Sequence, residues 1–157
     1  MGGSIDLPFG LATSVGALPC TEPDEAVRMA LRAQPDFPCT PSLGLTHGSL
    51  LAQAVEGIGG VEVLPPGLLR VDHALADGEP EAVGLEGDSY ATFRGFVDGL
   101  RGAAPEVGVR VSLLGPVTLA LGLRAAGVTT ARAVELAQVT VATRAAAMLG
   151  AVRDVMA

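Results

Sequence analysis

Short apolar runs that end at Gly or Pro alternate along this chain with longer segments of helical periodicity. Strands are expected at residues 11–15, 61–64 and 107–114, and the last run alternates most clearly, at Val109, Val111 and Leu113. Strands joined by long helical connections pair in parallel, so this alternation predicts an α/β domain built on a parallel sheet.

The helical segments have recognisable starts and inward faces. Helices are expected at about 21–33, 49–58, 88–103, 118–123 and from 130 to the end of the sequence. Thr21 and Pro23 are typical of a helix start. The helical spacing predicts an inner face for the third helix at Tyr90, Phe93, Val97 and Leu100, and for the last helix at Val134, Ala137, Val141, Met148 and Val152.

The 157 residues are enough for one domain with a real core, and 49% are hydrophobic, which argues against disorder. All ten basic residues are Arg. Without Lys, the chain cannot form a Schiff base on a side-chain amine and has no P-loop lysine. Pyridoxal-phosphate enzymes, Schiff-base aldolases and Walker-type nucleotide hydrolases are therefore excluded.

The formal net charge of −7, with 17 acidic and 10 basic residues, does not suit a nucleic-acid partner. The first ten residues lack the basic start of a signal peptide. The longest apolar run, residues 111–123, is broken by Gly115 and Pro116 and is shorter than the ~20 residues that span a bilayer. We therefore expect a cytoplasmic protein, no membrane contact, and free thiols at Cys20 and Cys39.

Two motifs lie at predicted strand ends: residues 13–21 read TSVGALPCT and residues 114–119 read LGPVTL. In sequence, order and spacing they resemble the superfamily of uroporphyrinogen decarboxylase and cobalamin-independent methionine synthase, and look closest to small bacterial proteins similar to the synthase's C-terminal domain. The resemblance implies a partial (β/α)8 TIM-type barrel of three to four βα units with parallel strands. Since a full barrel needs ~250 residues, residues 1–157 are interpreted as a single N-terminal half-barrel domain, truncated relative to the full barrel.

The resemblance also implies a substrate-binding set at these strand ends, whereas no catalytic residue is assigned. Ala17 stands where the family usually has Ser, so one hydroxyl is missing. The family places a Glu that holds the substrate amino group shortly after the second strand, but residues 65–68 read PPGL. The implied substrate-binding residues are Ser14, Val15, Gly16, Ala17, Gly115, Pro116 and Thr118.

The family's zinc ligands lie in later strands, so no cofactor is expected in this chain, and zinc only in a full-length relative. Within the chain, Cys20, Cys39, His47 and His73 lack metal-site spacing and are interpreted as two core thiols and two loop histidines. Asp72 and His73 could form an acid–base pair, although a solvated turn is favoured. Ser49 is expected to cap the following helix.

Three functions follow from these observations. The first is a methionine-synthase-like half-barrel that carries part of a small-molecule substrate pocket and is inactive alone; as an enzyme it would be a thiol methyltransferase. The alternative is a non-catalytic binding or assembly module that dimerises through the open half-barrel, the expected partner being a second copy or the missing C-terminal half. The third is a decarboxylase-like tetrapyrrole binder, which needs clustered Arg, whereas only Arg70 follows a predicted strand end.

Overall fold

The computed structural model describes residues 10–44, 47–72, 84–103, 105 and 108–156. Its elements are β1 (Ala17–Leu18), α1 (Pro23–Ala33), β2 (Ser42–Leu43), α2 (Leu50–Val55), β3 (Val61–Leu64), β4 (Leu68–Val71), the 3-10 helix η1 (Asp88–Tyr90), α4 (Ala91–Ala103), α5 (Pro116–Ala125) and α6 (Thr130–Met156). The chain is thus a mixed α/β structure, as predicted, with small sheets in place of a large one.

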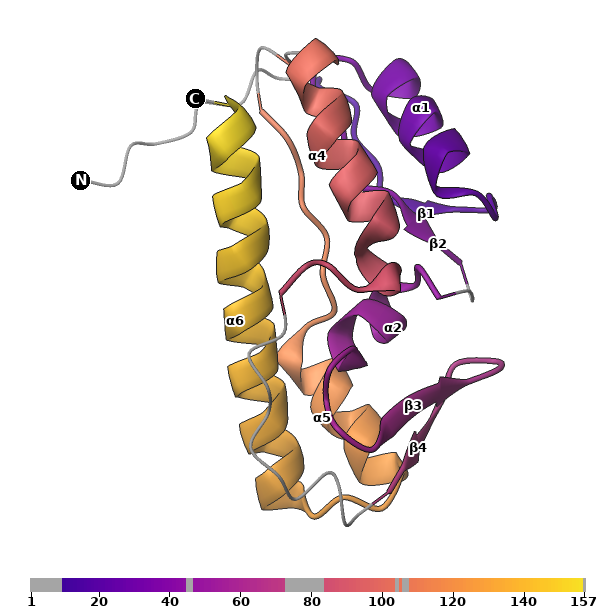
Figure 1. Ribbon diagram of the computed structural model, residues 1–157, viewed down its shortest axis with the longest axis vertical. Coiled ribbons are helices and arrows are strands. Elements are labelled where there is room, and N and C mark those ends of the chain that lie inside the picture. The colour runs from indigo at the N-terminus through magenta and orange to yellow at the C-terminus, as the bar shows by residue number, and fades with distance from the viewer. Residues whose placement is uncertain (1–9, 45–46, 73–83, 104, 106–107, 157) are drawn as a thin grey trace, which may run out of the picture.

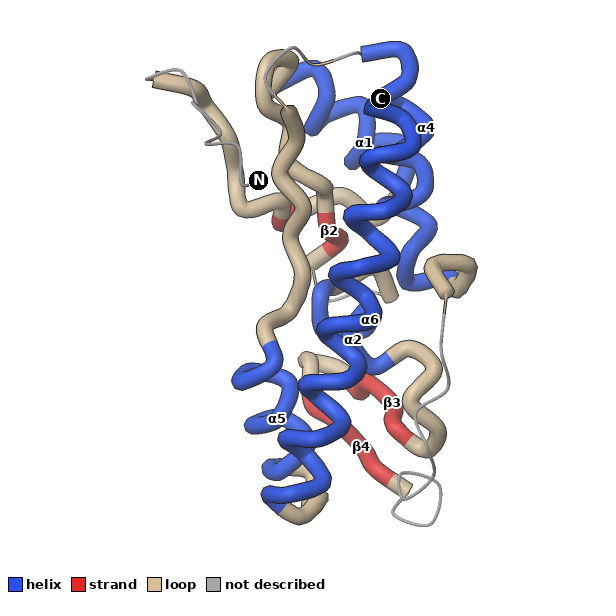
Figure 2. The backbone as a smooth tube through the Cα atoms, turned by 90° about the vertical axis from the view of Figure 1, so that its left-hand side faces the viewer, coloured by secondary structure: helices blue, strands red, loops and turns tan. Residues whose placement is uncertain are grey.

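A layer of extended chain lies on one side of the molecule and helices cover its other side (Figures 1 and 2). β1 pairs in parallel with β2, and the segment 108–114 runs alongside, joined to residue 39 by one parallel bridge between Cys39 and Arg110. Helices α1, α4 and α6 form the covering layer. The arrangement is a parallel α/β layer; no closed barrel is formed by the described residues.

The predicted strand 11–15 is wrong, because β1 comes later, at Ala17–Leu18. The Ser14 hydroxyl accepts a hydrogen bond from the Gly16 amide at 3.2 Å, and Gly16 takes a positive φ of 85°. The chain turns there, and pairing begins only after the turn. At Gly16 the backbones are so close that an added Cβ would lie 2.3 Å from the Thr40 carbonyl oxygen.

Of the predicted strand 107–114, the described residues 108–114 are extended, and among the described residues they form only the single bridge at Arg110. One residue pair further along, the Ser112 amide donates to the Thr40 side-chain oxygen at 3.0 Å, which takes the place of a backbone acceptor and interrupts the ladder. The alternation still identifies a face correctly: Val109, Val111 and Leu113 all pack against the cluster between α4 and α6.

The expectation that all strands are parallel is also wrong. β3 and β4 form an antiparallel hairpin, with Val61 opposite Val71 and Leu64 opposite Leu68. The Pro65-Pro66-Gly67 segment ends β3, as predicted, but it then turns the chain back, because Gly67 has a φ of 107° and its amide donates to the Leu64 carbonyl at 2.7 Å.

The helix predictions hold more closely. Tyr90, Phe93, Val97 and Leu100 are all buried. In α6 the buried side follows a spacing of three or four residues, so Val134, predicted to face inward, lies one position off it and is 40% exposed. The buried residues of α6 are Ala133, Leu136, Ala137, Thr140, Arg144, Met148 and Val152.

The core of the described residues has three parts; α6 contributes buried residues to two of them, and its Val155 packs against the third. A lower cluster joins α2, α5, the start of α6 and the hairpin, with Leu119, Leu123 and Leu136 at its centre. An upper cluster holds Tyr90 and Met148. A third lies between α1 and α4. Because α6 spans both main clusters, it fixes the hairpin end of the molecule relative to the parallel layer.

Candidate functional site

The carboxyl ends of the parallel segments lie at one end of the layer. Ala17 is level with Ser42 and Leu18 with Leu43, and the bridge at Arg110 aligns the third segment in the same direction. In parallel α/β folds this end carries the binding groups, because the loops that leave the strands gather there.

An open hollow of about 340 Å³ lies at this end. Residues of β1 and β2, of the start of α2 and of the hairpin contribute to its lining. The described lining residues are two serines, apolar residues and glycines, with no charged residue among them. The lining residues are Ala17, Ser42, Gly44, Ser49, Leu50, Leu51, Val63, Pro66 and Gly67.

The two serines of the hollow differ in what their hydroxyls do. Ser49 is the N-cap of α2, as predicted, and its hydroxyl oxygen accepts from the Ala52 amide at 3.1 Å. Ser42 is only 5% exposed, and its amide donates to the Gly16 carbonyl at 2.8 Å. Ser42 lines the hollow, and its hydroxyl has no hydrogen-bond partner in the part of the chain that the structure describes; it is not one of the buried unpartnered atoms, so solvent reaches it.

Of the first predicted motif, Ala17 alone lines the hollow. Ser14 and Gly16 shape the turn before β1, with the Ser14 carbonyl also accepting from Arg110 at 3.0 Å. Val15 is 68% exposed beside them. Gly16 therefore permits a close backbone approach, as its sequence context suggested, but the neighbour is Thr40.

The second predicted motif lies apart from the hollow. Gly115 is the N-cap of α5 and Pro116 its first residue, and both are exposed, like Thr118. The preceding Leu113 and Leu114 line a cavity together with Leu50. Leu50 also lines the hollow. The segment before the second motif and the hollow therefore share Leu50 as a neighbour.

The remaining candidates do not gather into a metal site in the described ranges. Cys20 is half-buried and Cys39 buried, and both are free thiols, as expected. Cys39 Sγ lies 3.4 Å from the Ser112 hydroxyl. His47 is exposed, and the expectation for His73 lies outside the described residues. Arg70 is exposed on β4 and forms an ion pair with Glu62 across the hairpin.

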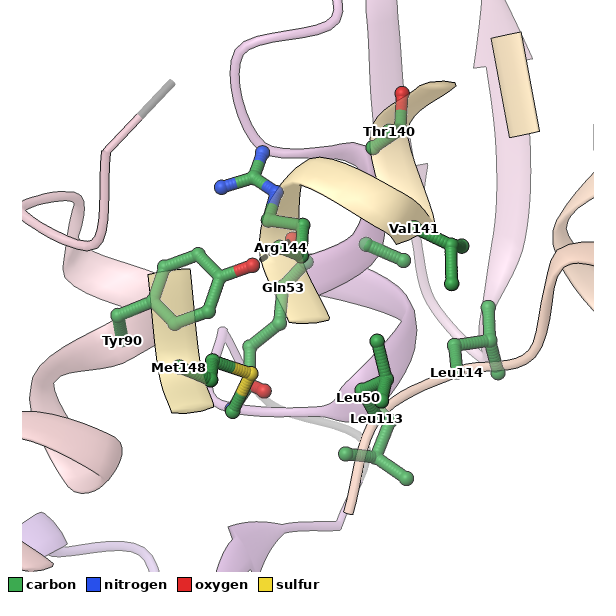
Figure 3. Close-up of a pocket in the computed structure, with 10 residues that line it drawn as sticks. Leu50, Gln53, Tyr90, Leu113, Leu114, Thr140, Val141, Arg144 and Met148 are labelled. Carbon is green, nitrogen blue, oxygen red and sulfur yellow. Dashed lines mark hydrogen bonds between the residues drawn. The ribbon is translucent and has the colours of Figure 1, made fainter. Parts of the chain in front are cut away.

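A buried polar cluster at the junction of α2, η1 and α6 escaped the sequence analysis (Figure 3). The Tyr90 hydroxyl donates to the Gln53 carbonyl at 2.7 Å, and the Arg144 guanidinium lies 5.0 Å from the ring centre. Arg144 also donates to the carbonyls of Glu56 and Gly84. Burial raises the pKa of Tyr90 to about 12, although the positive charge of Arg144 opposes the shift. Arginine on a helix normally indicates a solvated face, so periodicity could not reveal this cluster.

The cluster borders a cavity of about 10 Å³, room for one water molecule. Thr140 Oγ1 lines it and has no partner among the described residues. Such hydroxyl and guanidinium groups within a helical core fix helix positions, so we assign this cluster a structural role.

No protein-family model, curated protein or solved structure matches the chain. In the described ranges, no helix combines the length and the apolar character needed to cross a bilayer.

Proposed function

We propose that this chain is the substrate-binding half of a methionine-synthase-like barrel, and that it binds a small molecule in the hollow at the carboxyl ends of β1 and β2. The observation that carries the proposal is the hollow itself, which brings together Ala17 of the first motif and the residues 66–67, near which the family holds its substrate. Its volume is at the lower end of the roughly 300–1,000 Å³ typical of ligand pockets.

We limit the proposal to binding, because the described lining residues include two serines but no Asp, Glu, His or Cys that could activate them or act as an acid or base. Methyl transfer to a thiol needs an activated thiolate, and no group of three or more candidate zinc ligands occurs among the described residues. We therefore expect no thiol methylation by this chain alone.

Protein-observed NMR tests the proposal. We expect millimolar methionine, or one of a set of small alcohols and amides, to shift the amide signals of Ala17, Ser42 and Gly67 in a saturable way. Ala17→Phe should abolish these shifts, because the new ring would fill the hollow. Val15→Phe is the matched control: it adds the same ring two residues earlier, outside the lining. The proposal fails if no compound shifts these amides, or if both variants behave alike.

The second candidate is an assembly module, and the free edge of the extended layer favours it. Val111 and Leu113 have no backbone hydrogen-bond partner among the described residues. Unpaired edges promote association, and a second copy offers the same edge through a two-fold axis. Val15 and Val117, which is 71% exposed, add apolar surface next to the layer's segments. The mass of the protein in solution decides between a monomer and this dimer.

A further inference from the structure

Among the described lining residues of the hollow, Ser42 has a hydroxyl that is not used by a hydrogen bond within the protein. It lies in β2, level with Ala17, and is 95% buried, given an exposure of 5%. Its hydroxyl has no hydrogen-bond partner among the described residues and lines the open space. The hydroxyl is not among the buried polar atoms that lack a partner, so solvent reaches it, and a ligand that displaces this solvent can take up its hydrogen bond.

We propose that the hollow accepts the uncharged, hydrogen-bonding end of a small molecule, such as a carboxamide, and that the Ser42 hydroxyl is the contact that selects it. This inference rests on the proposed function, since it names the ligand class of the same hollow.

The absence of charge in the lining decides the ligand class. The described lining holds no Arg, His, Asp or Glu that could pair with a carboxylate or an ammonium group. Moving an unpaired ion out of water is far more costly than moving a hydrogen-bonded amide. A serine hydroxyl can both donate and accept. It can therefore bind the carbonyl oxygen or the N–H of an amide equally well.

The apolar lining residues indicate what the rest of the ligand should be. Leu50, Leu51 and Val63 present apolar surface, and Pro66 closes the side formed by the hairpin. A branched or short aliphatic body fits such walls. The hairpin wall stands where the resemblance expects a Glu for an amino group, so a zwitterionic amino acid has no anchor for its ammonium end.

Three compounds of nearly equal shape test the inference: 3-methylbutanamide, 3-methylbutanoate and 3-methylbutylamine, each titrated into the whole protein by NMR near neutral pH. We expect the amide to bind at least tenfold more tightly than either ion. Ser42→Ala should weaken amide binding about three- to tenfold, the effect of one hydrogen bond. Ser112→Ala is the control, because it removes a hydroxyl from the neighbouring segment outside the hollow.

The possible results distinguish failure of this inference from failure of the proposed small-molecule binding in the hollow. Tighter binding of either ion, or unchanged amide binding by Ser42→Ala, overturns the inference and leaves the hollow as a binding site. Failure of all three compounds, together with failure of the broader ligand set, overturns both. Because Ser42→Thr keeps a hydroxyl, retained binding by this variant would support the hydrogen bond even if Ser42→Ala folded poorly.

Discussion

At the scale of single residues, the hydroxyls of Tyr90 and Ser42 lie in two different surroundings, one bonded within the core and one reached by solvent. Tyr90 donates to the Gln53 carbonyl and contacts the Arg144 guanidinium, so its hydroxyl belongs to the core. Ser42 has no such partner among the described residues. The first arrangement stabilises the fold, whereas the second leaves a hydrogen bond to be made by something else.

Tyr90 gives a prediction at this scale, because it is the only tyrosine of the chain. Its pKa of about 12 in the folded protein lies above the ordinary value of 10.0. Above pH 10 the unfolded chain loses the phenolic proton while the folded chain keeps it, so the free energy of unfolding falls as the pH rises from about 10 to about 12.

Ultraviolet absorbance of tyrosinate measures this titration directly. We expect a midpoint near 12 in the folded protein and near 10 in denaturant. Tyr90→Phe should show no tyrosinate signal and lose the part of the alkaline destabilisation that comes from this group. A folded-state midpoint equal to that in denaturant would contradict the burial of Tyr90.

At the scale of elements, the turn before β1 approaches the backbone at Thr40 so closely that Gly16 has no room for a side chain. Gly16→Ala would require a left-handed alanine, which costs about 1–2 kcal/mol. It would also place a Cβ against the Thr40 carbonyl, 2.3 Å away in the present backbone. We expect the free energy of unfolding to fall by at least about 2 kcal/mol, measured by urea denaturation.

Gly150→Ala is the matched control, since Gly150 lies inside α6 and an added Cβ meets nothing within 4 Å. Alanine is favoured over glycine in a helix by roughly 0.5–1 kcal/mol, so this variant should be slightly more stable. Equal effects of the two substitutions would show that the close approach at Gly16 does not matter for stability.

The same elements explain what the sequence could predict. Nearby residues signal where a helix starts, and Pro23 at the start of α1 and Ser49 as the N-cap of α2 are both confirmed. The N-cap of α1 is Glu22, however, and not Thr21. Strand pairing depends on distant residues. Whether Ser112 bonds a backbone carbonyl or the Thr40 side chain, and whether Gly67 ends a strand or turns a hairpin, is decided by neighbours that the local pattern does not contain.

The candidate site was predictable only in part, for a similar reason. Ala17 of the first motif lines the hollow, as do Pro66 and Gly67 of the segment where the family's Glu is missing, whereas substrate binding at these residues stays a prediction. Ser42 lies in a Pro-rich stretch with no periodicity, and it enters the hollow only through its register with Ala17. No local sequence pattern identifies a side chain that reaches a pocket only because its strand pairs in a particular register.

At the scale of the whole molecule, the helices cover one side of the extended layer and leave its edge free (Figure 2). We expect light scattering to give a mass near twice 15.8 kDa if a second copy pairs with that edge. Replacing both Val15 and Val117 by Glu should shift the protein toward the monomer, because charge disfavours burial of this surface. Leu149→Glu on α6 is the control. A monomer in the unmodified protein would rule out this assembly.

Leu50 has a further consequence, because its side chain lines both the hollow and the internal cavity that Tyr90 also lines. The chain contains no Trp and one Tyr, so its ultraviolet emission comes chiefly from a fluorophore one side chain behind the candidate site. A molecule entering the hollow that displaces Leu50 would alter the surroundings of that fluorophore. We therefore expect the emission of Tyr90 to report occupancy of the hollow without an attached dye.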